Sequence, residues 1–196
     1  MKIFTVRHGQ THWNTIGRMQ GHTDTELDEV GIDQAKRLGV RLAKEKVDII
    51  YASDLVRAAK TAEIINSHHN AEIVTTPALR ELHFGIFDGC IYDEAVAEEM
   101  DYYQNSKLPL PGGESIYDYY DRISGFLAEI TAKHHRNIFI VGHFGTVRAA
   151  ICYLLQIPIE EREKYDIFNT AIHCFQRGDD GKFCMTLEND VSHLEF

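Results

Sequence analysis

Two histidines and two arginines lie just beyond short apolar segments of the chain. Arg7-His8-Gly9 and Gly142-His143 each come directly after such a segment, and Arg57 lies a few residues beyond a third. Histidine is one of the side chains that form covalent intermediates. The guanidinium fork of arginine matches the oxygens of a phosphate group. If these four side chains meet in one cleft, they predict an enzyme that acts on a dianion.

The side chains can meet only if the apolar segments are parallel strands of one sheet. Four runs have the composition of strands: 2–6, 47–52, 73–74 and 137–141. They alternate with four segments whose apolar residues recur at helical spacing: 30–46, 55–65, 116–130 and 146–155. This alternation is typical of a mainly parallel sheet covered by helices on both faces. Because ligands bind beyond the carboxyl ends of such strands, we expect Arg7, His8, Arg57 and His143 to converge there.

The remaining segments complete a predicted α/β fold. Residues 9–28 are expected to form a long loop of the kind that is usually functional, and Ser53 is the predicted N-cap of the helix after it. Proline and glycine punctuate residues 77–113, where a helix is expected between about Tyr92 and Gln104. Two late runs, 170–176 and 182–188, predict a hairpin. We therefore predict a single domain over 1–196, a three-layer α/β/α sandwich with a small helical cap insertion at about 86–115.

Composition narrows the classes of protein that the chain can belong to. The net charge of -10 argues against general nucleic-acid binding, and no apolar run reaches membrane-spanning length. The four cysteines form no Cys-x-x-Cys pair, so neither a zinc knuckle nor a redox motif is indicated. Cys174 and Cys184 could face each other across the hairpin, but reduced thiols are favoured. We expect a cytoplasmic protein, and its oligomeric state is left open.

The motifs together resemble one known family. Arg7-His8-Gly9-Gln10-Thr11 with Trp13-Asn14 is similar to the signature of the histidine phosphatase, or phosphoglycerate mutase-like, superfamily. Further matches follow in order along nearly the whole chain: Gln20-Gly21, Ser53-Asp54-Leu55 with Arg57-Ala58, Glu81-Leu82-His83-Phe84-Gly85, Pro111-Gly112-Gly113-Glu114-Ser115 and Val141-Gly142-His143. Any one of these pieces is only suggestive, whereas the ordered set is specific.

The resemblance implies a role for each residue of the predicted site. His8 would attack phosphorus and become a phosphohistidine, and the neighbouring Arg7 and Arg57 would disfavour its imidazolium form. Both arginines and His143 would hold the phosphoryl oxygens, with Asn14 adding a hydrogen bond. Glu81 matches the proton donor of the family, although its local sequence alone indicates an exposed loop carboxylate. No metal or other cofactor is implied, because the cationic side chains supply the positive charge.

Substrate contacts and specificity follow less directly from the resemblance. Gln20, Gly21, His22 and Phe144 are candidate substrate-binding residues for a small phosphorylated metabolite. The tyrosines around the start of the 116–130 helix are read as packing residues or as lining of the cap: Tyr117, Tyr119 and Tyr120.

Three functions compete. Leu82 and Phe144 stand where mutases of the family usually carry arginine and glycine, so a phosphatase is favoured over a phosphoglycerate mutase. Within the phosphatases, the chain is similar to alpha-ribazole phosphatases and to small broad-specificity enzymes. The third alternative is a non-catalytic protein that binds a phosphorylated ligand, and the presence of all five predicted catalytic residues argues against it.

Overall fold

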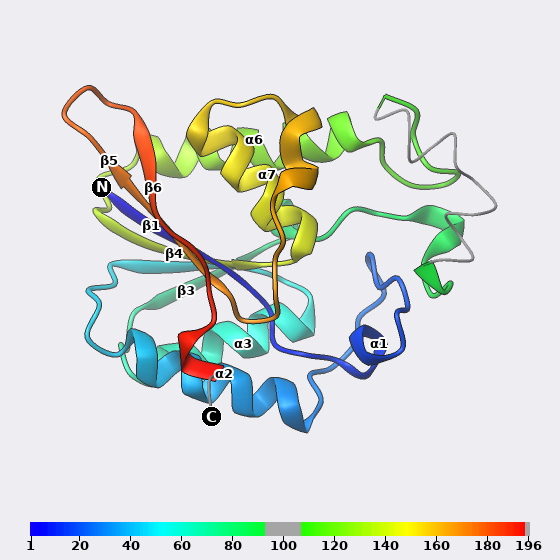
Figure 1. Cartoon of the computed structure of the whole chain (residues 1–196), viewed down its shortest axis with the longest axis horizontal. Helices are drawn as coiled ribbons and strands as arrows, with labels where there is room; N and C mark the ends of the chain where they lie inside the picture. Colours follow the sequence, from blue (N-terminus) through cyan, green and yellow to red (C-terminus); the bar gives the residue numbers. More distant parts are fainter. Residues whose placement is uncertain (93–106, 195–196) are drawn as a thin grey trace.

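A six-stranded sheet forms the centre of the molecule, as a computed structural model of residues 1–92 and 107–194 shows (Figure 1). Its strands are β1 (Lys2–Arg7), β2 (Ile49–Ser53), β3 (Glu72–Thr76), β4 (Asn137–Gly142), β5 (Ile172–Arg177) and β6 (Phe183–Asp190). Their order across the sheet is β3-β2-β4-β1-β5-β6. The first four strands in that order are parallel to one another, β5 runs antiparallel to β1, and β6 runs antiparallel to β5. The prediction of a mainly parallel sheet is confirmed.

Helices cover both faces of the sheet. On one face α2 (Glu29–Leu42) packs against α3 (Val56–Asn66), and on the other α6 (Ile116–Ala132) packs against α7 (Phe144–Leu155) (Figure 1). Side chains of β1 alternate between the two layers, since Ile3 belongs to the apolar core under α6 and α7 while Phe4 and Val6 belong to the other core. This is the predicted α/β/α sandwich.

The carboxyl ends of the parallel strands meet at one edge of the sheet. Arg7, the last residue of β1, pairs in register with Gly142, the last residue of β4. Ser53 and Thr76 pair in the same way at the ends of β2 and β3. Two short 3-10 helices, Pro77–Leu79 and Gly85–Phe87, lie in the chain that follows β3. The topology thus brings the segments with the predicted site residues to a common edge.

Two local predictions differ from the structure. Ser53 is not a helix N-cap, because its pairing with Thr76 keeps it in β2, and α3 begins after Leu55, which makes no side-chain capping bond. The predicted loop 9–28 contains a short helix, α1 (His12–Thr15), which Thr11 caps through its side chain. Beyond Tyr92, the helix predicted up to Gln104 lies outside the described residues.

The hairpin of β5 and β6 is formed as predicted, and its register decides the state of two cysteines. Cys184 pairs with Gln176, and Cys174 pairs with Leu187, so the two thiols do not face each other. All four cysteines are free. The register therefore argues against the cross-hairpin disulfide, and reduced thiols stay the favoured prediction.

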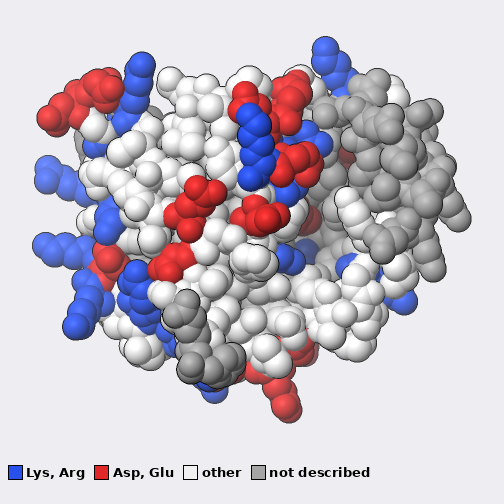
Figure 2. Space-filling view, in the orientation of Figure 1, with Lys and Arg blue, Asp and Glu red and all other residues white. Residues whose placement is uncertain are grey.

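Two further 3-10 helices complete the described chain, Ile159–Lys164 and Ser192–Leu194. On the face that Figure 2 displays, basic and acidic side chains lie among one another. No helix within 1–92 or 107–194 combines the length and apolar character needed to cross a membrane.

Candidate active site

His8 follows directly after β1 and is only 3% exposed. Its Nδ1 lies 2.7 Å from the carbonyl oxygen of Gly9. Because a carbonyl oxygen only accepts, Nδ1 carries the proton and donates it, which leaves the lone pair of the neutral ring on Nε2. The backbone is fixed on both sides, since His8 N donates to Gly142 O (2.9 Å) and Asn169 Nδ2 donates to His8 O (2.9 Å). Nε2 is therefore the available nucleophilic atom.

Burial and two neighbouring cations keep His8 neutral. Burial lowers the pKa of His8 well below 6.5, Arg57 and Arg7 lower it further, and the hydrogen bond to Gly9 opposes the shift only in part. Both arginines thus lower the pKa of His8, but burial is the larger cause. At neutral pH the ring is held in the form that can attack an electrophile.

Arg57 is fully buried and Arg7 is half-buried, and both cations have unused donors. Arg57 donates from Nη1 to Thr23 O (2.9 Å) and from Nη2 to Gly21 O (2.8 Å), and Arg7 donates from Nη1 to Ile167 O (2.8 Å). Burial lowers the pKa of each to about 10, so both stay protonated at neutral pH. Among the described residues, the Nε–H of neither arginine has a hydrogen-bond partner. Both guanidinium groups can therefore donate to an anion.

His143 supplies a second buried imidazole beside the first. It is the N-cap residue of α7, and its ring centroid lies 5.2 Å from that of His8. Burial lowers the pKa of His143 well below 6.5, and Arg57 adds to the shift. Within the part of the chain that the structure describes, neither ring nitrogen of His143 has a hydrogen-bond partner. A buried polar group without a partner calls for an explanation, and a ligand oxygen would provide one.

One cleft of about 620 Å³ brings most of the predicted site together. Its lining includes eight of the nine predicted site residues: Arg7, His8, Asn14, Gln20, Gly21, Arg57, Glu81 and Phe144. The ninth, His143, lies against His8. His22, also a candidate contact, lies beside the loop of Glu81 instead, where its Nε2 donates to the carbonyl oxygen of Glu81 (3.0 Å).

The candidate substrate contacts are themselves held in place. Thr11 N donates to Asn14 Oδ1 (3.1 Å), and the hydroxyl of Thr11 donates to Gln20 Oε1 (3.1 Å). With the oxygen of Asn14 occupied, its amide nitrogen is the atom left to donate to a ligand. The ring of Phe144 contacts two cations, with its centroid 5.3 Å from the guanidinium of Arg7 and 4.1 Å from that of Arg148.

Glu81 is not the exposed loop carboxylate that its local sequence indicates. Its Oε1 accepts hydrogen bonds from Leu82 N (2.9 Å) and from the hydroxyl of Tyr119 (3.1 Å). Its Oε2 accepts from Gly145 N (3.2 Å), in the first turn of α7. The carboxylate of Glu81 is therefore fixed by donors from α6, from α7 and from its own loop. It also lines the cleft.

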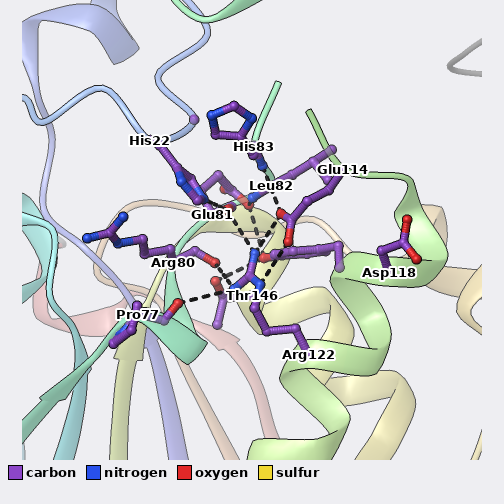
Figure 3. Close-up of polar contacts among 12 residues, drawn as sticks. His22, Pro77, Arg80, Glu81, Leu82, His83, Glu114, Asp118, Arg122 and Thr146 are labelled. Atoms are coloured by element: carbon purple, nitrogen blue, oxygen red, sulfur yellow. Dashed lines mark hydrogen bonds and ion pairs between the residues drawn. The ribbon is translucent and has the colours of Figure 1, made fainter. Parts of the chain in front are cut away.

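Arg122, on α6, holds the backbone of the segment that ends in Glu81. Figure 3 shows its guanidinium among the carbonyl groups of this segment. It donates to the carbonyl oxygens of Ala78 (3.0 Å), Arg80 (3.1 Å) and Glu81 (3.3 Å). No motif points to Arg122 in the sequence, and the prediction missed it.

Glu114 links Arg122 to the chain after Glu81. It accepts two hydrogen bonds from Arg122, at 2.9 and 2.7 Å, and a third from His83 N (3.0 Å). Burial raises the pKa of Glu114, but the bonds from Arg122 and His83 outweigh it and the net shift is downward. A Cβ on Gly113 would lie 2.2 Å from His83 O, so only glycine permits this approach. Residues 111–115 thus connect the loop that carries Glu81 to α6, and Ser115 is the N-cap of that helix.

The comparisons with known proteins agree on one family. The chain matches the family described as the histidine phosphatase superfamily (branch 1) over residues 3–190. It is 38% identical over 203 residues to phosphoglycerate mutase-like protein 4 of Arabidopsis thaliana, covering 99% of this chain and 87% of that protein. It is 33% identical to the metal-independent phosphoserine phosphatase of the same plant, covering 98% and 83%. The crystal structure of the alpha-ribazole phosphatase from Shigella flexneri is similar with a TM-score of 0.88 and 26% identity, covering 97% of this chain and 96% of that one.

Proposed function

Because the chain belongs to branch 1 of the histidine phosphatase superfamily, we propose that it is a metal-independent phosphomonoesterase that works through a phosphohistidine at His8. One observation carries the proposal: His8, Arg7, Arg57 and Glu81 line the same cleft of about 620 Å³. The cleft therefore combines a neutral imidazole, two cations and a carboxylate. Metal independence is also supported by the name of the phosphoserine phosphatase relative.

In the first half-reaction His8 takes the phosphoryl group. The lone pair of Nε2 forms a bond to phosphorus while the bond from phosphorus to the ester oxygen breaks. The electron pair goes to the leaving oxygen, which receives the proton of Glu81 and departs as an alcohol. Arg7, Arg57 and His143 hold the three non-bridging oxygens, whose charge they stabilise during transfer.

In the second half-reaction water takes the phosphoryl group from His8. Glu81, now a carboxylate, accepts a proton from water as the water oxygen bonds to phosphorus. The bond from phosphorus to Nε2 breaks, its electron pair returns to the ring, and inorganic phosphate leaves. The hydrogen bond from Nδ1 to Gly9 O keeps the ring orientation the same in both halves.

We propose that the substrate is a small phosphorylated metabolite. Relatives are named for phosphoserine and for alpha-ribazole phosphate, so these two esters are the first candidates. Leu82 and Phe144 stand where mutases of the family usually carry arginine and glycine. Leu82 is buried in the apolar core, and Phe144 stacks on Arg7, so both positions are occupied by packed apolar side chains. This favours hydrolysis over a phosphoglycerate mutase.

Hydrolysis of p-nitrophenyl phosphate in the presence of EDTA tests the proposal. We expect turnover between mildly acidic and neutral pH, and His8→Ala should lose both turnover and acid-labile phosphate labelling. No turnover in that pH range would contradict the phosphatase and favour the non-catalytic alternative. Labelling that survives in His8→Ala would remove His8 as the nucleophile.

A panel of phosphorylated metabolites then identifies the substrate. It should include alpha-ribazole phosphate, phosphoserine and 3-phosphoglycerate, with inorganic phosphate and 2-phosphoglycerate both measured as products. Release of phosphate is expected. Formation of 2-phosphoglycerate from 3-phosphoglycerate would show the mutase instead.

A further inference from the structure

A buried tyrosine hydroxyl contacts the carboxylate of Glu81 from the side of α6. Tyr119 is 3% exposed, and its ring belongs to the apolar core between the sheet and helices α6 and α7. Its hydroxyl lies 3.1 Å from Oε1 of Glu81 and 3.0 Å from the hydroxyl of Thr146. Burial raises the pKa of Tyr119 well above 10, and the charge of Glu81 raises it further. The hydroxyl therefore stays protonated and donates a hydrogen bond to Glu81.

The hydrogen bonds of Glu81 divide unequally between its two oxygens. Oε1 accepts from Tyr119 and from Leu82 N, and two bonds occupy both lone-pair sites of a carboxylate oxygen. In the described part of the chain, Oε2 accepts a single bond, from Gly145 N. Oε2 is therefore the oxygen that has a lone-pair site left for a proton.

The pair of Tyr119 and Glu81 is fixed from two further directions. Because the tyrosine proton goes to Glu81, the hydroxyl of Thr146 donates its own proton to the tyrosine oxygen, and the carbonyl oxygen of Leu79, 3.2 Å away, is its alternative acceptor. A Cβ on Gly145 would lie 2.6 Å from Oε1 of Glu81 and 3.1 Å from the tyrosine oxygen. The start of α7 thus packs directly on the pair, which restricts the carboxylate to one orientation.

We propose that Tyr119 is a positioning residue that occupies Oε1 of Glu81 and so assigns the transferable proton to Oε2. This inference rests on the proposed function, because it takes Glu81 as the acid and then the base. In the first half-reaction the proton on Oε2 passes to the leaving oxygen. In the second, Oε2 accepts a proton from water. Tyr119 donates to Oε1 throughout and keeps its own proton.

The dependence of kcat/KM on the leaving group in Tyr119→Phe tests this role. Without the hydroxyl, the carboxylate loses one of its three donors, and Oε1 gains a lone-pair site that competes with Oε2 for the proton. We expect kcat/KM to fall by about tenfold for an alkyl phosphate, whose leaving oxygen needs that proton, and by less for p-nitrophenyl phosphate. Tyr120→Phe, the neighbouring change on α6, is the matched control and should leave both values unchanged.

A double-mutant cycle with Glu81→Gln separates this inference from the function on which it rests. If Tyr119 acts through Glu81, Tyr119→Phe should lower kcat/KM in the wild-type background and have no further effect in Glu81→Gln. Equal losses for the two substrates, or an equal loss of activity in both backgrounds, would overturn the role of Tyr119 while leaving the phosphatase intact. Full activity in Glu81→Gln itself would overturn the acid assignment, and with it the role of Tyr119.

Discussion

Arg7, His8 and His143 come directly from the ends of two neighbouring parallel strands, whereas Glu81 stands on a loop beyond the third strand. We refer to Arg7, His8, Arg57 and His143 as the clamp side of the cleft, and to Glu81 with its contacts Tyr119, Arg122 and Gly145 as the acid side. The backbone of His8 is hydrogen-bonded to the end of β4, so the pairing of the sheet itself sets its position. Glu81 does not lie in a strand of the sheet, and hydrogen bonds from side chains of α6 set its position instead.

This difference decides how each side responds to mutation. Backbone pairing does not depend on which side chains a strand carries, so the clamp side keeps its geometry when a distant side chain changes. The acid side depends on individual side-chain donors, each of which one substitution removes. We therefore expect mutations on the clamp side to abolish most of the activity. Mutations around Glu81 should lower the activity by smaller amounts that differ from residue to residue.

The largest effect is expected on the clamp side, in Arg57→Lys. A lysine ammonium cannot reproduce the fork that donates to Thr23 O and Gly21 O and still reach a phosphate oxygen. Loss of such a donor should lower kcat/KM for p-nitrophenyl phosphate by about a hundredfold or more and weaken inhibition by inorganic phosphate. Arg37→Lys, whose exposed guanidinium pairs with Asp33, is the control. A loss of only a few-fold would show that the clamp does not rely on this guanidinium.

The clamp side could be predicted from the sequence because its residues follow strands. An apolar run that ends in Arg7-His8-Gly9 and another that ends in Gly142-His143 carry the information locally, and the parallel-sheet rule joins them. The observed register, with Arg7 opposite Gly142, is the geometry that this rule requires. Ser53 shows the limit of the local reading, because pairing in the sheet overrides its preference for a helix N-cap.

The acid side could not be predicted in the same way. Tyr119 and Arg122 look in the sequence like ordinary residues of an amphipathic helix, and periodicity does not say which loop a helix packs against. Glu81 itself was identified only through the resemblance to a family. One local signal is Gly145, directly before the predicted helix 146–155, since a glycine where a helix begins often has a packing reason. The structure supplies that reason in the carboxylate of Glu81.

Gly145→Ala tests how tightly the acid side is packed. The new Cβ would lie 2.6 Å from Oε1 of Glu81, so the carboxylate must move away from Tyr119 and from the backbone of α7. We expect kcat to fall by about tenfold or more, because small displacements of a catalytic group are expensive. In Gly125→Ala, on α6, the new methyl group meets no atom within 4 Å, and that variant should keep full activity. Normal kcat in Gly145→Ala would mean that the contact with α7 does not position Glu81.

Arg122→Gln should have a smaller effect that depends on the leaving group. The substitution removes donors to the carbonyl oxygens of Arg80 and Glu81 and leaves Glu114 without its cation. We expect kcat/KM to fall by about tenfold for an alkyl phosphate, whose leaving oxygen needs the proton of Glu81, and by less for p-nitrophenyl phosphate.

Arg80→Gln is the matched control for Arg122→Gln, since its guanidinium pairs with Asp54 at the surface of the same segment. This bidentate pair makes no contact with the carboxylate of Glu81, so both substrates should be hydrolysed normally. Equal losses for the two substrates in Arg122→Gln would assign Arg122 to folding of the loop rather than to the placement of Glu81.

The smallest effect is expected at His173, a histidine that is buried in the sheet but lies outside the lining of the cleft. His173, on β5, is buried opposite Thr5 of β1, and its ring nitrogens have no hydrogen-bond partner among the described residues. Burial lowers its pKa from 6.5 to about 4. The unfolded chain therefore binds this proton first as the pH falls. The resulting stability is complete above about pH 6.5 and is lost progressively towards pH 4.

His173→Leu should remove that part of the pH dependence. Between pH 7.5 and 5.5 the free energy of unfolding, measured with urea, should fall by about 1.4 kcal/mol less in the variant than in the wild type. His8 and His143 remain in both proteins, so their own contributions cancel in this difference. His12→Gln, at an exposed position on α1, should follow the wild type. If His173→Leu also follows the wild type, then burial in the sheet does not keep this imidazole neutral. The low pKa of His8 would then have to come from Arg57 and Arg7, the cations that distinguish the clamp side from the rest of the sheet.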